Sequence, residues 1–170
     1  MFPATSSKLI RTAVVLVLLV LPGFMQAAAA ASTDPQPKDI LAGIYTDAVK
    51  GKAPSDWLLE PKRRGKYLSK SMMALWAKVD GKRQEEDPMD WDPTTDTNAL
   101  ELRDFVITTK SRSEAAAVLA VKMIYRDYTG PTPVITYSFV REDGHWRIDE
   151  MRGPKWSLSG HLKFWQKKGA

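Results

Sequence analysis

The chain has 170 residues, of which 44% are hydrophobic and 26% charged, and its formal net charge at pH 7 is +5. A chain of this length is typical of one globular domain with a core of its own. It contains no cysteine, which excludes disulfides, a thiol nucleophile and a lipoprotein anchor, since each needs a cysteine side chain. The small positive charge does not favour a nucleic-acid partner.

Residues 1–31 have the order of segments that is typical of a secretory signal peptide. Lys8 and Arg11 precede an apolar run at residues 12–21, and a run of alanines ends at Ala31. We expect cleavage within or just after these alanines and export to the periplasm or beyond. An uncleaved membrane anchor is the alternative, but a spanning helix needs roughly 20 strongly apolar residues.

After a short linker at residues 32–37, apolar side chains recur with helical spacing. At residues 38–50 they fall at i, i+1, i+4, i+5, i+8 and i+9, which predicts an amphipathic helix. A second helix is predicted from residue 69 or 70 to residue 79, with Ser69 as its N-cap. Between the two helices, residues 56–60 predict one short helical turn that ends at Pro61.

The polar segment at residues 82–99 predicts a long loop. After it the hydrophobic period changes from helical to two, which predicts β-strands. The predicted strands are residues 102–108, 115–125, 134–141 and 145–151. Alanines in the second strand favour a helix, but the alternation of its apolar side chains decides for a strand. Asp143-Gly144 is a signal for a tight hairpin turn.

These elements predict an α+β domain at residues 38–152, with helices packed on an antiparallel sheet of about four strands. A basic tail follows at residues 153–170. Leu158, Leu162 and Trp165 lie at i, i+4 and i+7, which predicts a short amphipathic helix that docks on the domain. The lysines of this tail also fit weak contact with an anionic membrane surface.

Three segments resemble those of a known family. They are Tyr67-Leu68-Ser69 leading to Ala74-Leu75-Trp76, the loop Asp90-Trp91-Asp92-Pro93 with Asp96, and the hairpin Asp143-Gly144-His145-Trp146-Arg147-Ile148-Asp149-Glu150-Met151. They resemble a family of exported bacterial domains of unknown function, similar to the nuclear transport factor 2-like (cystatin-like) superfamily. The resemblance, over roughly residues 37–152, implies helices in the concave face of a curved sheet, a cone-shaped cavity and a possible homodimer. It implies no activity.

The acidic loop has the spacing of a calcium site. Oxygen-bearing side chains occupy positions 1, 3, 5, 7, 9 and 12 of a twelve-residue window: Asp90, Asp92, Thr94, Asp96, Asn98 and Glu101. Such loops need glycine at position 6, where this chain has Thr95, and Glu101 begins a predicted strand. We therefore predict no metal and expect a solvated loop whose Asp and Thr side chains bond the local backbone.

An enzyme that uses the cavity is an alternative to a binding domain. Some relatives on this fold move protons with a buried Asp and a Tyr, and the candidates here are Tyr125, Tyr137, Asp104 and Asp149. The simpler interpretation makes the tyrosines sheet aromatics and Asp149 a charge partner of Arg147 or Arg152. Neither a G-x-S-x-G motif nor a glycine-rich phosphate loop is present, so no catalytic residue or cofactor is predicted.

The sequence therefore predicts an exported, non-catalytic α+β domain. We expect it to bind a small ligand or a protein partner in the periplasm, through its cavity or its sheet face. The alternatives are an isomerase or hydrolase that uses the cavity, and a peripheral protein at a membrane surface.

Overall fold

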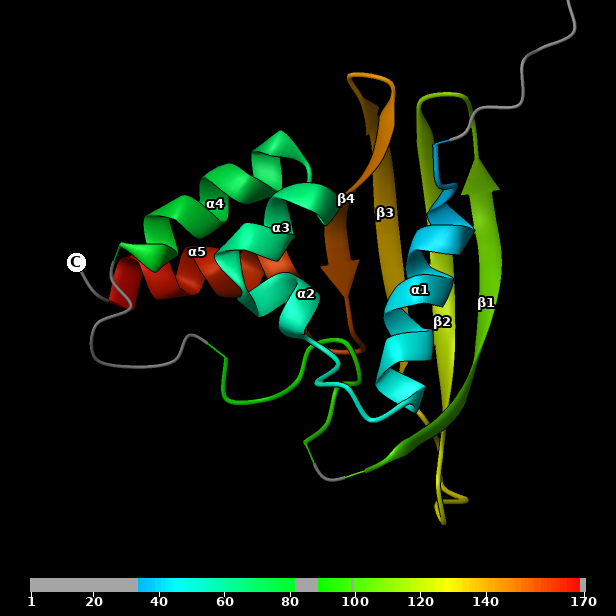
Figure 1. The fold of residues 1–170 in the computed structure, drawn as a ribbon. Helices are drawn as coiled ribbons and strands as arrows, with labels where there is room; N and C mark the ends of the chain where they lie inside the picture. Colours follow the sequence, from blue (N-terminus) through cyan, green and yellow to red (C-terminus); the bar gives the residue numbers. More distant parts are fainter. Residues whose placement is uncertain (1–33, 82–88, 99, 169–170) are drawn as a thin grey trace, which may run out of the picture. The chain divides into compact units, whose positions relative to one another are not determined.

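The computed structural model describes residues 34–81, 89–98 and 100–168, which belong to one compact unit, Ser32–Ala170. The predicted signal peptide lies outside the described residues. Helices α1 (Pro37–Val49), α2 (Asp56–Leu59), α3 (Pro61–Tyr67) and α4 (Lys70–Asp80) come first (Figure 1). Strands β1 (Leu102–Arg112), β2 (Ala116–Tyr125), β3 (Val134–Glu142) and β4 (His145–Arg152) follow, and then helix α5 (Leu158–Lys168). Within the described ranges, no helix is both long enough and apolar enough to cross a membrane.

The four strands form one open antiparallel sheet in the order β1-β2-β3-β4, so each strand pairs with its neighbour in sequence. This confirms the predicted α+β class. Asp143 and Gly144 have φ angles of 51° and 83°, the left-handed values of the tight turn that suits a two-residue hairpin. The predicted alternation in β2 is also confirmed, because Leu119, Val121 and Met123 are buried and Lys122 is exposed.

Strand β1 is longer than predicted. It was expected to end at Thr108, but its pairing with β2 continues to Arg112 opposite Ala117, after a register shift between Thr109 and Ser111. The residues of β1 after Thr108 are exposed positions on the distal part of this hairpin. Because they are solvated on both faces, their polar character gave no signal of a strand.

Helix α3 was not predicted. Pro61 does end α2, but it also occupies the first turn of α3, where its missing N–H and fixed φ are tolerated. The predicted helices at residues 38–50 and 69–79 are confirmed to within about a residue as α1 and α4. Ser69 caps α4 as expected, since its hydroxyl accepts from the backbone N–H of Met72 at 3.1 Å.

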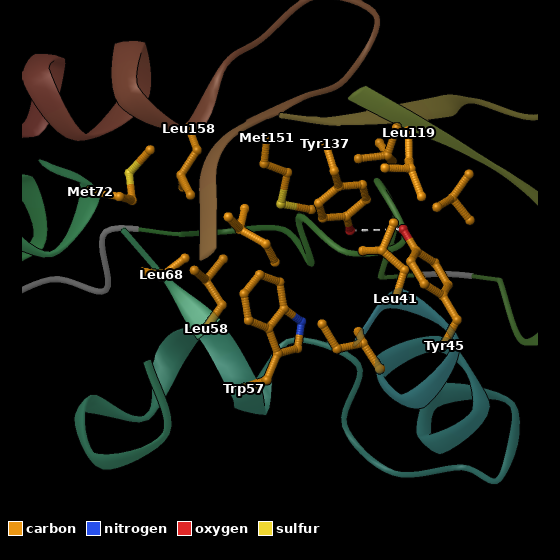
Figure 2. Close-up of a cluster of buried hydrophobic side chains, with 14 of the residues drawn as sticks. Leu41, Tyr45, Trp57, Leu58, Leu68, Met72, Leu119, Tyr137, Met151 and Leu158 are labelled. Carbon is orange, nitrogen blue, oxygen red and sulfur yellow. Dashed lines mark hydrogen bonds between the residues drawn. The ribbon is translucent and has the colours of Figure 1, made fainter. Parts of the chain in front are cut away.

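Side chains from helices and sheet fill the space between the two layers (Figure 2). Leu41 and Tyr45 come from α1, Tyr137 from β3 and Met151 from β4, and all four are completely buried. The family resemblance implied a cavity in this position. At these residues the structure instead has a packed hydrophobic core.

Strand β4 provides hydrogen-bond acceptors for the N-terminus of α4. The backbone N–H of Ser69 donates to the carbonyl of Ile148 at 2.9 Å. One carboxylate oxygen of Asp149 accepts from the hydroxyls of Ser69, at 2.7 Å, and Ser71, at 2.5 Å. A carboxylate at a helix N-terminus is also favoured by the helix dipole. Asp149 is thus bound to α4, where the sequence had suggested Arg147 or Arg152 as its partner.

Arg64 of α3 is buried in the helical layer. Its side chain is 0% exposed, and its two terminal nitrogens donate to the two carboxylate oxygens of Asp80 at 2.8 and 2.9 Å. Its guanidinium carbon lies 4.2 Å from the centre of the Trp76 ring. The charge of Arg64 is therefore neutralised by a paired carboxylate and covered by an aromatic face.

We expect Arg64→Ala to lower the free energy of unfolding by about 3–5 kcal/mol, because it breaks a buried ion pair and opens a space against Trp76. Urea unfolding of the purified protein measures this loss. Arg63→Ala is the matched control, since Arg63 is 40% exposed and makes only long ion pairs of 3.6 and 3.9 Å. It should cost less than about 1 kcal/mol. Equal losses for both variants would contradict a special role for Arg64.

Candidate ligand-binding site

A pocket of about 580 Å³ lies where β2 ends and the chain turns toward β3. Tyr125 and Tyr128 line it with Leu100 and three prolines: Pro131, Pro133 and Pro154. Its polar lining is smaller and consists of Asp96, Thr97, Thr132 and Lys155. The pocket is thus mainly apolar and aromatic, with one acidic and one basic side chain.

The rim of this pocket is closely packed. A Cβ atom on Gly130 would lie 2.4 Å from the hydroxyl oxygen of Tyr128, and one on Gly153 would lie 2.2 Å from the indole nitrogen of Trp156. Only glycine lets these two rings lie against the backbone. The Trp156 indole N–H also donates to a carboxylate oxygen of Asp96 at 2.6 Å. Tyr128 in the pocket wall, and Trp156 which binds the wall residue Asp96, are therefore held in place by the loops on which they rest.

Three buried tyrosines lie beneath the loop that forms one wall of the pocket. The hydroxyl of Tyr45 donates to the carbonyl of Thr94 at 2.8 Å, and the hydroxyl of Tyr137 lies 2.9 Å from that of Tyr45 (Figure 2). Because Tyr45 has one proton and gives it to Thr94, Tyr137 must donate to Tyr45. The hydroxyl of Tyr125 donates to the carbonyl of Thr95. Helix α1 and strand β2 thus supply donors to the loop backbone, and Tyr137 of β3 donates to the first of them.

A second set of bonds fixes the side chains of the same loop. The indole N–H of Trp57 donates to the Thr94 hydroxyl at 3.0 Å, and that hydroxyl lies 2.9 Å from the hydroxyl of Ser55. Ser55 in turn donates to Asp92 at 2.7 Å. The same oxygen of Asp92 accepts the backbone N–H groups of Thr94 and Thr95, at 2.8 and 3.1 Å. These hydrogen bonds link Trp57, Thr94 and Ser55 in series, and the series ends at the carboxylate of Asp92.

The expectation of a solvated loop is wrong at this point. Thr94 is 0% and Thr95 is 3% exposed. The predicted local bonds from an Asp to the backbone are present at Asp92, but they lie inside the molecule. Residues 82–88 of the predicted loop and residue 99 lie outside the described residues.

Burial raises the pKa of the three tyrosines above the ordinary phenol value. Loss of hydration raises the pKa of Tyr45 and of Tyr137 well above the usual range for a phenol. Burial likewise raises the pKa of Tyr125, and the nearby negative charges of Asp96 and Asp92 raise it further. All three therefore remain neutral hydroxyls well above neutral pH. Tyr45 and Tyr125 donate to the loop carbonyls, and Tyr137 donates to Tyr45.

A smaller pocket of about 320 Å³ lies on another side of the same loop. It shares Thr97 and Leu100 with the larger pocket and is otherwise lined by the end of α1, the following turn and the start of β1. Thr97 and Leu100 therefore border both hollows. Of the two, the larger has the greater aromatic lining.

The structure brings only some of the candidate residues to the pocket. Tyr125 lines it, whereas Tyr137 lies in the core. Asp104 is exposed on β1, where its carboxylate accepts from the backbone N–H of Phe105 at 2.8 Å. Asp149 caps α4. Neither of these carboxylates joins a tyrosine, and the acid that shares the pocket with Tyr125 is Asp96.

The calcium candidates have other partners. Asp92 binds the loop backbone, Asp96 accepts from Trp156, and Glu101 forms an ion pair of 3.1 Å with Arg126. Asp90 contributes its backbone carbonyl, which accepts from the side chain of Asn98 at 2.8 Å. Among the described residues, no three His, Cys, Asp or Glu side chains gather as a metal ion would require.

Sequence reasoning missed Tyr45, Tyr128 and Trp156 as parts of this region. Tyr45 had a usable signal, because a tyrosine in the buried stripe of a helix needs a partner for its hydroxyl. Tyr128 lies just before a Gly-Pro turn, and Trp156 lies at the start of the tail. Nothing local to Tyr128 indicates that it reaches the wall of a pocket, and nothing local to Trp156 indicates that it binds Asp96.

Comparisons with known proteins place few constraints on this chain. No protein-family model matches the sequence, and no curated protein matches it. Among solved structures, it is similar to a phospholipid-binding protein from Ralstonia solanacearum, determined in complex with a phospholipid. The likeness has a TM-score of 0.37 and 12% sequence identity, over 80% of this chain and 85% of the other. A likeness this weak assigns neither a fold family nor a ligand to this chain.

We expect Tyr45→Phe to destabilise the protein more than Tyr137→Phe. Loss of the Tyr45 hydroxyl leaves the buried carbonyl of Thr94 without a donor and Tyr137 without an acceptor, at a cost of about 1–3 kcal/mol. Loss of the Tyr137 hydroxyl removes a donor but leaves the Thr94 bond intact, so it should cost about 1 kcal/mol. Urea unfolding of both variants measures the difference. The reverse order would contradict the donor directions given above.

The buried tyrosines also predict a loss of stability in alkali. Above the ordinary phenol pKa of 10.0, tyrosines of the unfolded chain release protons while the buried ones keep theirs. The unfolded state then binds fewer protons, so the free energy of unfolding falls as pH rises, by up to about 1.4 kcal/mol per pH unit for each tyrosine. Urea unfolding between neutral and strongly alkaline pH measures this slope.

The control for this pH dependence is the double variant Tyr45→Phe/Tyr137→Phe. It should show a shallower alkaline slope than the parent chain, because two of the three buried phenols are gone. Absorbance of ionised phenol should appear together with unfolding. Ionisation of these tyrosines at their ordinary pKa, within the folded protein, would contradict their burial.

Proposed function

We propose that this chain is an exported, non-catalytic domain that binds a small, largely apolar ligand in the pocket between Tyr125, Tyr128 and Pro154. The observation that carries the proposal is the pocket itself. Its volume of about 580 Å³ falls in the range of roughly 300–1,000 Å³ that is typical of small-molecule sites. Such sites combine an apolar lining with a few polar groups, as this one does.

The rigidity of the rim supports a binding role. Three prolines fix the backbone around the opening, the ring of Tyr128 rests on Gly130, and Trp156 binds the wall residue Asp96. A pocket that is shaped before the ligand arrives loses less conformational entropy on binding. Asp96 and Lys155 at its wall would orient a ligand that has a polar end.

The state of the tyrosines supports binding over catalysis. Tyr125 has its proton committed to the Thr95 carbonyl, and burial keeps it un-ionised near neutral pH. A general acid or base works best with a pKa near the operating pH. The candidate carboxylates Asp104 and Asp149 lie elsewhere, so the pocket offers contact area and orientation and no paired proton-transfer groups.

Export and superfamily membership belong to the same proposal. Export is supported by the order of charged, apolar and alanine-rich segments before Ser32. The nuclear transport factor 2-like assignment is supported by the hairpin and helix motifs and by the order of helices followed by a four-strand meander. A periplasmic or secreted domain without cysteine would undergo no disulfide exchange in that compartment.

Native mass spectrometry of the protein, purified gently from the exporting cell, tests the proposal. We expect an additional mass of a small molecule on the wild-type chain, and loss of that mass in Tyr128→Ala, because the substitution removes the 39% exposed ring from the pocket wall. Tyr128→Phe keeps the ring and should keep the ligand. The same spectra report the mass of the chain and thus whether residues 1–31 have been removed.

The matched control is Phe164→Ala, which removes an exposed aromatic ring outside the pocket. It should retain the ligand as the wild type does. Where no ligand survives purification, titration with the apolar dye 1-anilinonaphthalene-8-sulfonate provides the probe. Tyr128→Ala should then bind the dye at least about fivefold more weakly than Tyr128→Phe, as expected for one buried ring. Equal behaviour of the two variants would exclude the pocket as the binding site.

A further inference from the structure

Helix α5 buries one side against the rest of the domain. Leu158 and Leu162 are completely buried, and the helix packs on α4 and β4. This confirms the docking predicted from the spacing of Leu158, Leu162 and Trp165, with Trp165 half-buried. Phe164 lies on the other side of the helix and is 60% exposed. A large apolar side chain is thus presented to solvent although the helix already has a buried face.

Basic residues surround this exposed ring. Lys163 precedes Phe164, and Lys167 and Lys168 follow it at i+3 and i+4, the spacings that bring side chains together on a helix. All three lysines are exposed. Lys168 places its ammonium group 4.8 Å from the centre of the Trp165 ring. Phe164, Lys163, Lys167 and Lys168 form a surface that we call the α5 outer face.

The sequence of this helix contains no acidic residue to offset its lysines. Residues 153–168 contain four lysines and neither Asp nor Glu. Two exposed lysines elsewhere do have acidic partners, since Lys52 pairs with Asp47 and Lys70 with Asp143, at 2.9 and 2.8 Å. Within the described part of the chain, Lys163 and Lys167 make no ion pair. These two lysines of the α5 outer face therefore present positive charge beside an exposed apolar ring.

We propose that the α5 outer face docks on the surface of an anionic lipid bilayer. Phe164 would enter the region between headgroups and acyl chains, while the lysines lie at the level of the lipid phosphates. Each lysine near such a surface strengthens binding about fivefold. The proposal rests on residues that do not line the pocket, so it stands or falls independently of the ligand-binding function.

A bilayer suits this surface better than an acidic protein does. A stable protein interface buries about 800 Å² on each partner, with several anchoring side chains. The α5 outer face has one exposed aromatic ring on a convex helix of 11 residues. Shallow insertion of one ring with surrounding lysines is sufficient for weak, reversible membrane contact, but a protein partner would need more area.

Local fluorescence on the intact protein tests the proposal. The chain contains no cysteine, so Phe164→Cys can be labelled with the small apolar fluorophore bimane at one position. The matched control is Val106→Cys, since Val106 is also an exposed apolar residue, 50% accessible, on β1. Vesicles of phosphatidylcholine with a one-third share of phosphatidylglycerol should shift the emission of the label at 164 to the blue. They should leave the label at 106 unchanged.

Charge reversal provides the second measurement. In sedimentation with the same vesicles, Lys163→Glu/Lys167→Glu should bind at least about tenfold more weakly than the wild type, and added salt should weaken the wild type further. The matched control, Lys110→Glu/Lys122→Glu, changes the same net charge on the exposed side of β1 and β2 and should bind nearly as the wild type. Thermal unfolding confirms that both variants fold.

Three outcomes would overturn the proposal. The label at 164 could remain in water on vesicles that hold the protein, as it would if residues 1–31 alone held the chain there. The two charge-reversed variants could bind equally. Polyglutamate could quench the label at 164 while vesicles leave it unchanged, which would assign the α5 outer face to an acidic protein.

Discussion

The structure depends on one constraint, which is that backbone carbonyls inside a protein need hydrogen-bond donors. The loop at Thr94 and Thr95 enters the domain and loses contact with water. Its carbonyls cannot be satisfied by a sheet or helix, so tyrosine hydroxyls from α1 and β2 supply the protons. The loop is held at the end of the sheet, and its outer residues, Asp96 and Thr97, become a wall of the pocket.

Much of the fold could be predicted from the sequence. The stripe at residues 38–50, the alternation in β2 and the Asp143-Gly144 turn each indicate an element without reference to the rest of the chain. Prediction failed where the governing interaction is distant in sequence. Helix α3 is stabilised by Arg64, whose partner Asp80 lies 16 residues further along the chain, and the end of β1 is defined only by its pairing with β2.

The candidate site was less predictable, for a related reason. Tyr125 was identified, since an aromatic residue in an alternating strand must lie on one face or the other. The acidic residue that lines the pocket with Tyr125 was not identified, because acidic residues are common and their spacing does not show which face or loop they reach. Asp104 and Asp149 lie in strands as expected, yet local backbone and helix groups bind them. The acid at the pocket, Asp96, had been considered only as a possible calcium ligand.

The capping of α4 by β4 has a consequence for how the chain folds. Ser69 and Ser71 receive their partners from residues about eighty positions later in the sequence. A chain that is synthesised from its N-terminus therefore lacks the bonds from Asp149 to α4 until nearly all of the domain has been made. Contacts of such long sequence separation slow folding. The apolar side of α4 is exposed during that interval, which makes it a segment that a holding chaperone would recognise.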